Sequence, residues 1–189
     1  KAKALRAAEA KKAADKADRC WRKYVPTGES DYLARKGVKA YGLRFSPSGN
    51  GTVAVPMLRD GRVVGLQIIR GKDRGNKLEK QYWPAGMDKV GAYHLIGGIP
   101  RGLVLVAEGY ATAATLHEAT GLPVAVAFDA GSLMPVVADL AQKYRTSKIL
   151  ICADDDYLTP GNPGCEAARL AATAHGAAWC SPKFSEERS

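Results

Sequence analysis

The chain has 189 residues, of which 46% are hydrophobic, enough for one sizeable domain or for a small domain with a subdomain. It has no signal peptide, no apolar run of membrane-spanning length, no CxxC pair and no clustered histidines, which argues against a membrane protein or a zinc site and predicts a soluble, cytoplasmic protein. The formal net charge is +9, distributed as +8 over residues 1–50, +4 over residues 51–100 and −3 over residues 101–189.

The first predicted element is a helix from Lys1 to about Tyr24, rich in Ala, Lys and Arg, which a following proline and glycine end. Its apolar stripe is thin, so we expect it to pack near its C-terminal end and to fray over its first turns. A short helix over residues 31–36 follows, with Ser30 as the expected N-cap and Gly37 as the stop signal.

A β-hairpin is predicted next. Two strands, Thr52 to Leu58 and Val63 to Arg70, flank Arg59-Asp60-Gly61-Arg62, in which Asp-Gly is a strong signal for a tight turn. A polar, basic loop from Gly71 to Lys80 then leads to Gln81-Tyr82-Trp83-Pro84. This part of the chain is therefore expected to form a smaller basic α+β subdomain.

From Leu103 onward, strands and helices alternate. The expected strands are residues 103–107, 124–128, 149–153 and 177–180, and the expected helices are residues 111–120, 132–143 and 164–175. The strands are short, apolar and rich in β-branched residues, as strands buried on both faces of a sheet are. The fold class is therefore predicted to be α/β, with a parallel sheet flanked by helices and joined by right-handed crossovers.

Acidic residues follow two of these strands. Glu108 comes directly after the first strand, and Asp154-Asp155-Asp156 follow the third. Ligands of open α/β sheets bind beyond the carboxyl ends of the strands, and alternate residues of an extended segment point the same way. We therefore expect Glu108, Asp154 and Asp156 to converge, and three such carboxylates suit Mg²⁺ or Mn²⁺.

Acidic residues after strands also serve as helix N-caps or turn formers, and for Asp155 alone this interpretation is favoured. Asp129, at the end of the strand over residues 124–128, either assists the metal site or caps a helix. The charge distribution agrees with a nucleic-acid enzyme, in which a basic part holds phosphates and an acidic part holds cations. A basic surface that serves only solubility gives the same totals.

These residues carry a resemblance. Glu108-Gly109, then Asp154-x-Asp156, each after a strand, are similar to the two acidic motifs of a Toprim domain, the metal-binding catalytic domain of bacterial-type primases, topoisomerases and certain nucleases. Asn162-x-Gly164 resembles the start of the helix that follows the second motif in the primase branch. The upstream segments also resemble that branch, closest to primases of plasmids, phages and integrative elements: Tyr32-Leu33-Ala34-Arg35-Lys36-Gly37-Val38, Gly42-Leu43-Arg44-Phe45, the hairpin, Lys80-Gln81-Tyr82-Trp83-Pro84 and Gly91-Ala92-Tyr93.

The resemblance implies a DNA primase catalytic core, a nucleotidyltransferase that makes short primers on single-stranded DNA from NTPs or dNTPs. It implies Glu108, Asp154 and Asp156 as catalytic and metal-binding residues. Asp155 and Asp129 would surround these ligands without binding the metal directly. Nucleotide or template binding would fall to Arg70, Lys77, Lys80 and Tyr82. A replicative helicase is an expected partner, through regions that this chain does not carry.

The expected domains are a basic subdomain over residues 1–100, a Toprim domain over residues 101–183 and a tail over residues 184–189. Three other functions stay open at this point. A Toprim nuclease would use the same acids to cleave phosphodiesters, and a non-catalytic adaptor would only bind nucleic acid. A receiver-type phosphoacceptor also clusters acids at strand ends, but it would carry its Asp pair after the first strand.

Overall fold

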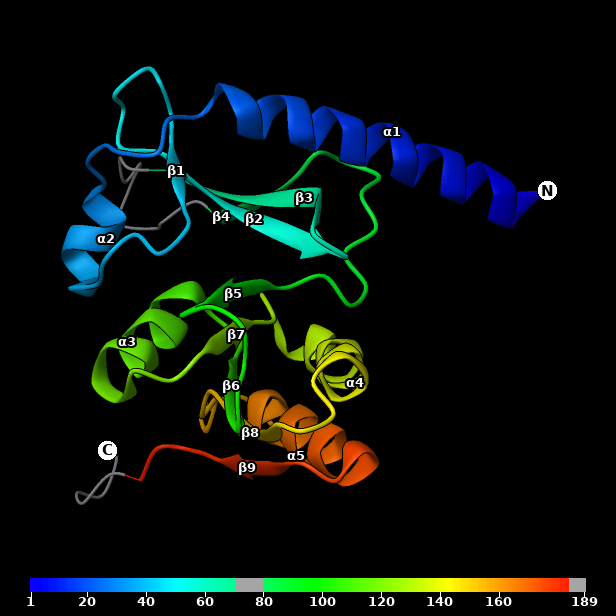
Figure 1. The fold of residues 1–189 in the computed structure, drawn as a ribbon, viewed down its shortest axis with the longest axis vertical. Coiled ribbons are helices and arrows are strands. Elements are labelled where there is room, and N and C mark those ends of the chain that lie inside the picture. Colours follow the sequence, from blue (N-terminus) through cyan, green and yellow to red (C-terminus); the bar gives the residue numbers. More distant parts are fainter. Residues whose placement is uncertain (71–79, 184–189) are drawn as a thin grey trace. The chain divides into compact units, whose positions relative to one another are not determined.

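The computed structural model describes residues 1–70 and 80–183, and the chain divides into two compact units, Lys1–His94 and Leu95–Ser189 (Figure 1). The loop predicted over residues 71–80 falls almost entirely outside the described residues. In the part of the chain that is described, no helix combines the length and the apolar character that crossing a bilayer requires.

The first unit begins with helix α1 (Ala2–Lys23), which packs on strand β3 (Arg62–Ile69). Its Ala13 and Ala17 are buried, because the helix lies close to the sheet at these small residues, whereas residues 1–9 are exposed. Ala17 joins Ala54 and Leu66 in a small core, against which Trp21 and Trp83 also pack. The predicted helix is confirmed.

The sheet of this unit is antiparallel, with strand order β1-β2-β3-β4. The predicted hairpin is formed by β2 (Val53–Arg59) and β3, and Asp60 and Gly61 both have positive φ, at 50° and 73°, which suits the Asp-Gly turn. β1 (Arg44–Phe45) and β4 (Lys80–Trp83) complete the sheet, and neither is long enough to be predicted from its own pattern.

Helix α2 (Asp31–Lys36) ends at Gly37, which takes the left-handed conformation with φ 64°, as expected. Ser30 is the N-cap residue of this helix, as expected. Ser30 is extended, as an N-cap residue should be, but its side chain makes no capping hydrogen bond, and its Oγ is buried without a hydrogen-bond partner.

The second sheet has strand order β5-β7-β6-β8-β9, and β6 pairs in parallel with both β7 and β8, as β8 does with β9. The predicted parallel α/β fold is confirmed. Its strands are β5 (His94–Ile96), β6 (Leu103–Ala107), β7 (Val124–Val126), β8 (Lys148–Cys152) and β9 (Ala178–Cys180). Its helices are α3 (Tyr110–Thr120), α4 (Leu133–Lys143) and α5 (Pro163–His175), with a short 3-10 turn, η1 (Ala130–Ser132).

The order of these strands determines where a ligand fits. Figure 1 shows α3 on one side of the sheet and α4 and α5 on the other. The helix after β6 and the helix after β8 therefore lie on opposite faces, while β6 and β8 are neighbours. Between such strands the connecting helices diverge, and this topological switch point is where α/β sheets bind ligands.

Candidate active site

Glu108 lies at this switch point, directly after β6 and before Gly109, the N-cap residue of α3. Its side chain is only 9% exposed, and its Oε1 atom is buried without a hydrogen-bond partner. Because β6 is flanked by β7 and β8, Glu108 stands between the acidic residues that follow those two strands. It is the central member of the group.

The Asp154–Asp156 segment is held by Asn162, the N-cap residue of α5, which has a left-handed backbone with φ 41°. The Asp156 backbone N–H donates to Asn162 Oδ1 at 3.0 Å, and Asn162 Nδ2 donates to Asp155 Oδ1 at 2.8 Å. Through these two hydrogen bonds, Asn162 holds the Asp154–Asp156 segment in place, and the Asp155 carboxylate serves as one of its partners. This clamp was missed from the sequence, although Asn before Pro is a usual helix-start signal.

Asp129 follows β7 and accepts a hydrogen bond from Ser132 Oγ at 2.8 Å on its Oδ1. Neither Asp129 nor Ser132 makes a side-chain capping hydrogen bond to the helix that follows it. Asp129 and Ser132 thus occupy the N-cap positions of η1 and α4, but their side chains bond to each other instead of to the helix backbone. Asp129 also adds a third carboxylate to the surroundings of Glu108, after Asp154 and Asp156.

These surroundings raise the pKa of the Glu108 carboxyl group from 4.5 to about 7. Burial is the largest cause, since it disfavours the charged form, and repulsion by Asp154, Asp156 and Asp129 follows in that order. A hydrogen bond from the backbone of Asp154 acts in the opposite direction and lowers this pKa. The repulsion shows that the three aspartates lie close enough to Glu108 to interact, whereas Asp155 is not among the causes.

Gly164, in the first turn of α5, is where the chain approaches the acids most closely. A Cβ atom on Gly164 would lie 3.0 Å from Glu108 Oε1 and 3.1 Å from Asp156 Oδ2, and it would clash with the backbone carbonyl oxygen of Asp154. Both carboxylate oxygens therefore face one point, at which only a glycine fits. The sequence holds a signal for this, because a glycine inside a helix costs about 1 kcal/mol relative to alanine and needs a reason.

Glu108→Gln is expected to stabilise the chain at alkaline pH. Between pH 4.5 and about 7 the folded chain binds more protons at Glu108 than the unfolded chain, so the free energy of unfolding falls as the pH rises through this window and stays low above it. The glutamine variant lacks this loss, which amounts to about 3 kcal/mol at most. Thermal melting at pH 8 should show an increase of several degrees, and melting near pH 4 should show almost none.

The matched control for this experiment is Glu118→Gln, which removes the same charge from an exposed position on α3. It should leave the pH dependence of the melting temperature as in the unaltered chain. If Glu108→Gln also left the pH dependence of the melting temperature unchanged, the crowding of carboxylates around Glu108 would be refuted.

A compact three-carboxylate metal cluster is not preformed. Within residues 1–70 and 80–183, no group of three or more His, Cys, Asp or Glu side chains is gathered closely enough to hold a metal ion.

The residues predicted to bind nucleotide or template lie in the first unit. Arg70 is exposed at the end of β3, and the Lys80 ammonium group lies 5.8 Å from the centre of the Tyr32 ring. Tyr82 is half-buried on β4, with the Lys89 ammonium group 4.6 Å from its ring centre. Lys77 lies outside the described residues. Of the four positions, Arg70, Lys80 and Tyr82 thus belong to the described part of the first unit, whereas the carboxylates belong to the second unit.

Residues 103–180 match the protein family described as "Toprim domain". This part of the chain is a Toprim domain. It contains Glu108, Asp129, Asp154 and Asp156, and the match confirms the resemblance that the two acidic motifs indicated.

Relatives of the whole chain extend the comparison beyond the Toprim domain. A protein named DNA primase TraC from Escherichia coli is 33% identical over 170 residues, which cover 85% of this chain and 16% of that protein. A second Escherichia coli protein of the same name is 33% identical over 162 residues and 11% of its length. The chain thus spans less than a fifth of these relatives.

Solved structures agree on the fold. A structure described as the DnaG primase catalytic domain bound to ssDNA superimposes with a TM-score of 0.59 at 13% identity, over 97% of this chain and 76% of that one. A structure of the DnaG catalytic core gives a TM-score of 0.50 at 18% identity, over 87% and 59%. The Toprim domain and the basic unit before it thus have the fold of a primase core.

Proposed function

We propose that this chain is the catalytic core of a DNA primase, which synthesises short oligonucleotide primers on single-stranded DNA by metal-dependent nucleotidyl transfer. The observation that carries the proposal is the group of Glu108, Asp154 and Asp156 at the switch point of a Toprim domain. The similarity of 85% of the chain to proteins named DNA primase supports the choice of reaction.

The carboxylates fit a divalent cation. Their oxygens are hard donors, Glu108 Oε1 has no hydrogen-bond partner, and mutual repulsion leaves negative charge that a cation would neutralise. Mg²⁺ usually takes only one or two carboxylates, together with water and substrate phosphates, so the lack of a compact three-carboxylate cluster among the described residues agrees with this mode of binding. Asp154 and Asp156 would hold the ion, and Glu108 would share it.

A bound divalent ion would supply charge neutralisation at the transferring phosphoryl group. The protein residues have their own tasks. Asn162 fixes the backbone of Asp156 and thereby the direction of its carboxylate. Glu108 is placed to accept a proton from a water or a 3′-hydroxyl group near its Oε1, which has no hydrogen-bond partner. Arg70, Lys77, Lys80 and Tyr82 are proposed to hold the triphosphate or the template.

The test is template-dependent synthesis. The chain is incubated with single-stranded DNA, labelled NTPs or dNTPs and Mg²⁺ or Mn²⁺, and the products are sized. Short new oligonucleotides that require the template support the proposal. Shortened template with no new strand would instead identify a Toprim nuclease, and unchanged DNA with retained binding would identify an adaptor.

Divalent ions are expected to stabilise the chain. An ion that binds only the folded state raises the free energy of unfolding by about 2.7 kcal/mol when its concentration is a hundred times its dissociation constant. Thermal melting at pH 8 should therefore shift upward with Mg²⁺ and more strongly with Mn²⁺, which binds nitrogen and oxygen ligands more tightly. The shift should disappear in Asp154→Asn/Asp156→Asn. Absence of stabilisation by either ion, with or without nucleotide, would mean that these acids are structural.

A further inference from the structure

One face of helix α1 is cationic near its N-terminal end and apolar farther along the helix. Residues Lys3, Arg6, Ala10, Ala13 and Ala17 follow one another at spacings of three and four, so they lie on one face of the helix. Ala13 and Ala17 of this face are 5% and 0% exposed against the sheet. The same face becomes cationic at Lys3 and Arg6, both exposed, where a helix that continued to pack on protein would carry apolar residues.

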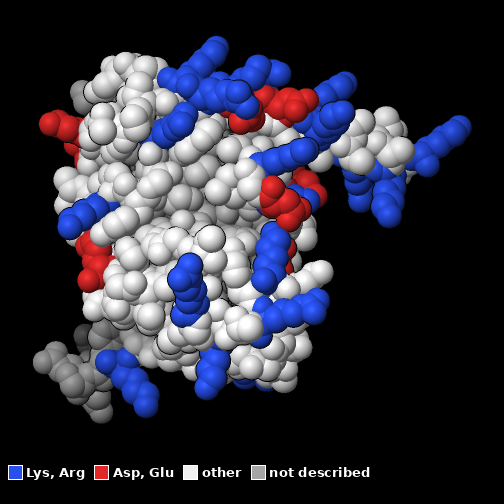
Figure 2. Space-filling view, in the orientation of Figure 1, with Lys and Arg blue, Asp and Glu red and all other residues white. Residues whose placement is uncertain are grey.

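A groove runs along this face. Its helix side carries four cations, Lys3, Arg6, Lys12 and Lys16, and its opposite wall is the segment over residues 84–88. From Lys3 to Lys16 the helix rises about 20 Å. We call this the basic groove. It lies wholly within the first unit, and Figure 2 shows Lys and Arg side chains along the projecting part of α1.

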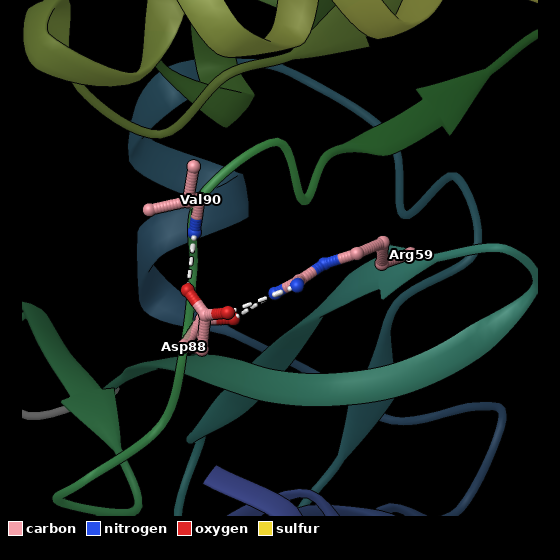
Figure 3. Close-up of polar contacts among 3 residues, drawn as sticks. All are labelled: Arg59, Asp88 and Val90. Atoms are coloured by element: carbon pink, nitrogen blue, oxygen red, sulfur yellow. Dashed lines mark hydrogen bonds and ion pairs between the residues drawn. The ribbon is translucent and has the colours of Figure 1, made fainter. Parts of the chain in front are cut away.

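The far wall of the basic groove is anchored to the sheet. Arg59 of β2 donates from Nη1 to Asp88 Oδ2 at 2.9 Å and from Nη2 to the Asp88 carbonyl oxygen, while Asp88 Oδ1 accepts from the Val90 N–H at 3.2 Å (Figure 3). Met87 packs on Gly65 of β3 so closely that a Cβ atom there would clash with its sulfur. The wall is therefore held in place by contacts of its own.

The ion pair between Arg59 and Asp88 affects the net charge of the basic groove. Two acids line it, Glu9 and Asp88, and Asp88 is already neutralised by Arg59. Among the described residues, Lys3, Arg6 and Lys12 take part in no ion pair. Lys16 lies with its ammonium group 5.2 Å from the centre of the Trp83 ring. Four cations thus face one unpaired carboxylate, and the groove carries a net positive charge.

We propose that the basic groove binds the phosphodiester backbone of single-stranded nucleic acid without reading its sequence. A line of cations about 20 Å long matches an extended polyanion. Between the cations, the lining consists of alanines on the helix and of small or apolar residues over 84–87 on the opposite wall, so it offers no set of polar side chains that could recognise bases. The choice of nucleic acid over another polyanion rests on the proposed function.

The test compares two double variants of α1. Lys3→Ala/Arg6→Ala removes two groove cations, and Arg19→Ala/Lys23→Ala removes two exposed cations from the opposite face of the same helix. Binding of a fluorescent oligothymidylate is followed by anisotropy between about 50 and 200 mM NaCl. The groove variant should bind about tenfold more weakly, with a slope of log affinity against log salt reduced by about 1.4, which corresponds to two phosphate contacts. The control variant should change the slope much less.

A second measurement separates direct contact from long-range attraction. The photocrosslinker p-benzoylphenylalanine is placed at Ala7, which lines the basic groove, or at the neighbouring Ala8, which does not. Crosslinking to the oligonucleotide should be strong from position 7 and weak from position 8. Equal crosslinking, an unchanged salt slope in the groove variant, or competition by polyglutamate as effective as that by oligothymidylate would each overturn the proposal.

The outcomes also distinguish this proposal from the proposed function. If the Lys3→Ala/Arg6→Ala variant binds DNA more weakly but the unaltered chain makes no primers, the basic groove is supported and the primase activity is refuted. If the unaltered chain makes primers but the Lys3→Ala/Arg6→Ala variant binds DNA normally, the primase activity is supported and the basic groove is refuted.

Discussion

The double substitution Asp154→Asn/Asp156→Asn is expected to reduce primer synthesis by about 10³-fold or more. Each change removes the charge of a proposed metal ligand with almost no change in volume. A divalent ion contributes several kcal/mol to stabilising the charge of the transition state, and each 1.36 kcal/mol is a factor of ten in rate. The measurement is the initial rate of template-dependent synthesis at saturating Mg²⁺ or Mn²⁺.

The matched control is Asp155→Asn. Its carboxylate accepts from Asn162 Nδ2 and does not act on the Glu108 pKa, so this variant should keep most of the activity. Thermal melting distinguishes lost chemistry from unfolding, because removing two charges beside Glu108 should raise the melting temperature of the metal-free chain at pH 8. Full synthesis by the double variant would contradict the assignment of these acids to catalysis.

The Toprim half of the fold could be predicted because its central strands, β6 and β7, are buried on both faces. A run such as Leu103–Ala107 has few alternatives to a central parallel strand, and the residue after it must then lie at the carboxyl edge of the sheet. The grouping of Glu108 with acids of the neighbouring strands depends only on strand order. For this reason the pattern of strands and acids was enough to indicate both the fold and the family.

The elements that the sequence did not reveal depend on contacts between distant segments. Strand β5 has three residues and forms at the edge of a sheet whose other strands come later in the chain. Ser30 occupies the N-cap position of α2, yet its hydroxyl is buried and makes no capping hydrogen bond. Cys152 and Cys180 look dispersed, yet they lie in register on β8 and β9, and burial together with Cys180 raises the pKa of the Cys152 thiol to about 12. Local patterns carry no information of this kind.

Gly164→Ala is expected to reduce both stability and activity, although alanine is the better helix former by about 1 kcal/mol. The added Cβ would meet the carbonyl oxygen of Asp154 and lie within 3.1 Å of two carboxylate oxygens, so the start of α5 or the Asp154–Asp156 segment must shift. Overpacking of this kind costs about 1–3 kcal/mol. Because a displacement of about 1 Å in a catalytic group can lower the rate about 10²-fold, primer synthesis should fall more than stability does.

Gly131→Ala is the control for this substitution, since a Cβ there would have its nearest neighbour, Asp129 Oδ1, at an ordinary contact distance of 3.6 Å. Its melting temperature and its rate of synthesis should stay close to those of the unaltered chain. Gly164→Ala should also weaken the stabilisation by Mn²⁺, because the moved carboxylates no longer face one point. A Gly164→Ala variant that is more stable than the unaltered chain and equally active would mean that α5 does not approach the acids this closely, and the role of Gly164 in shaping the site would be refuted.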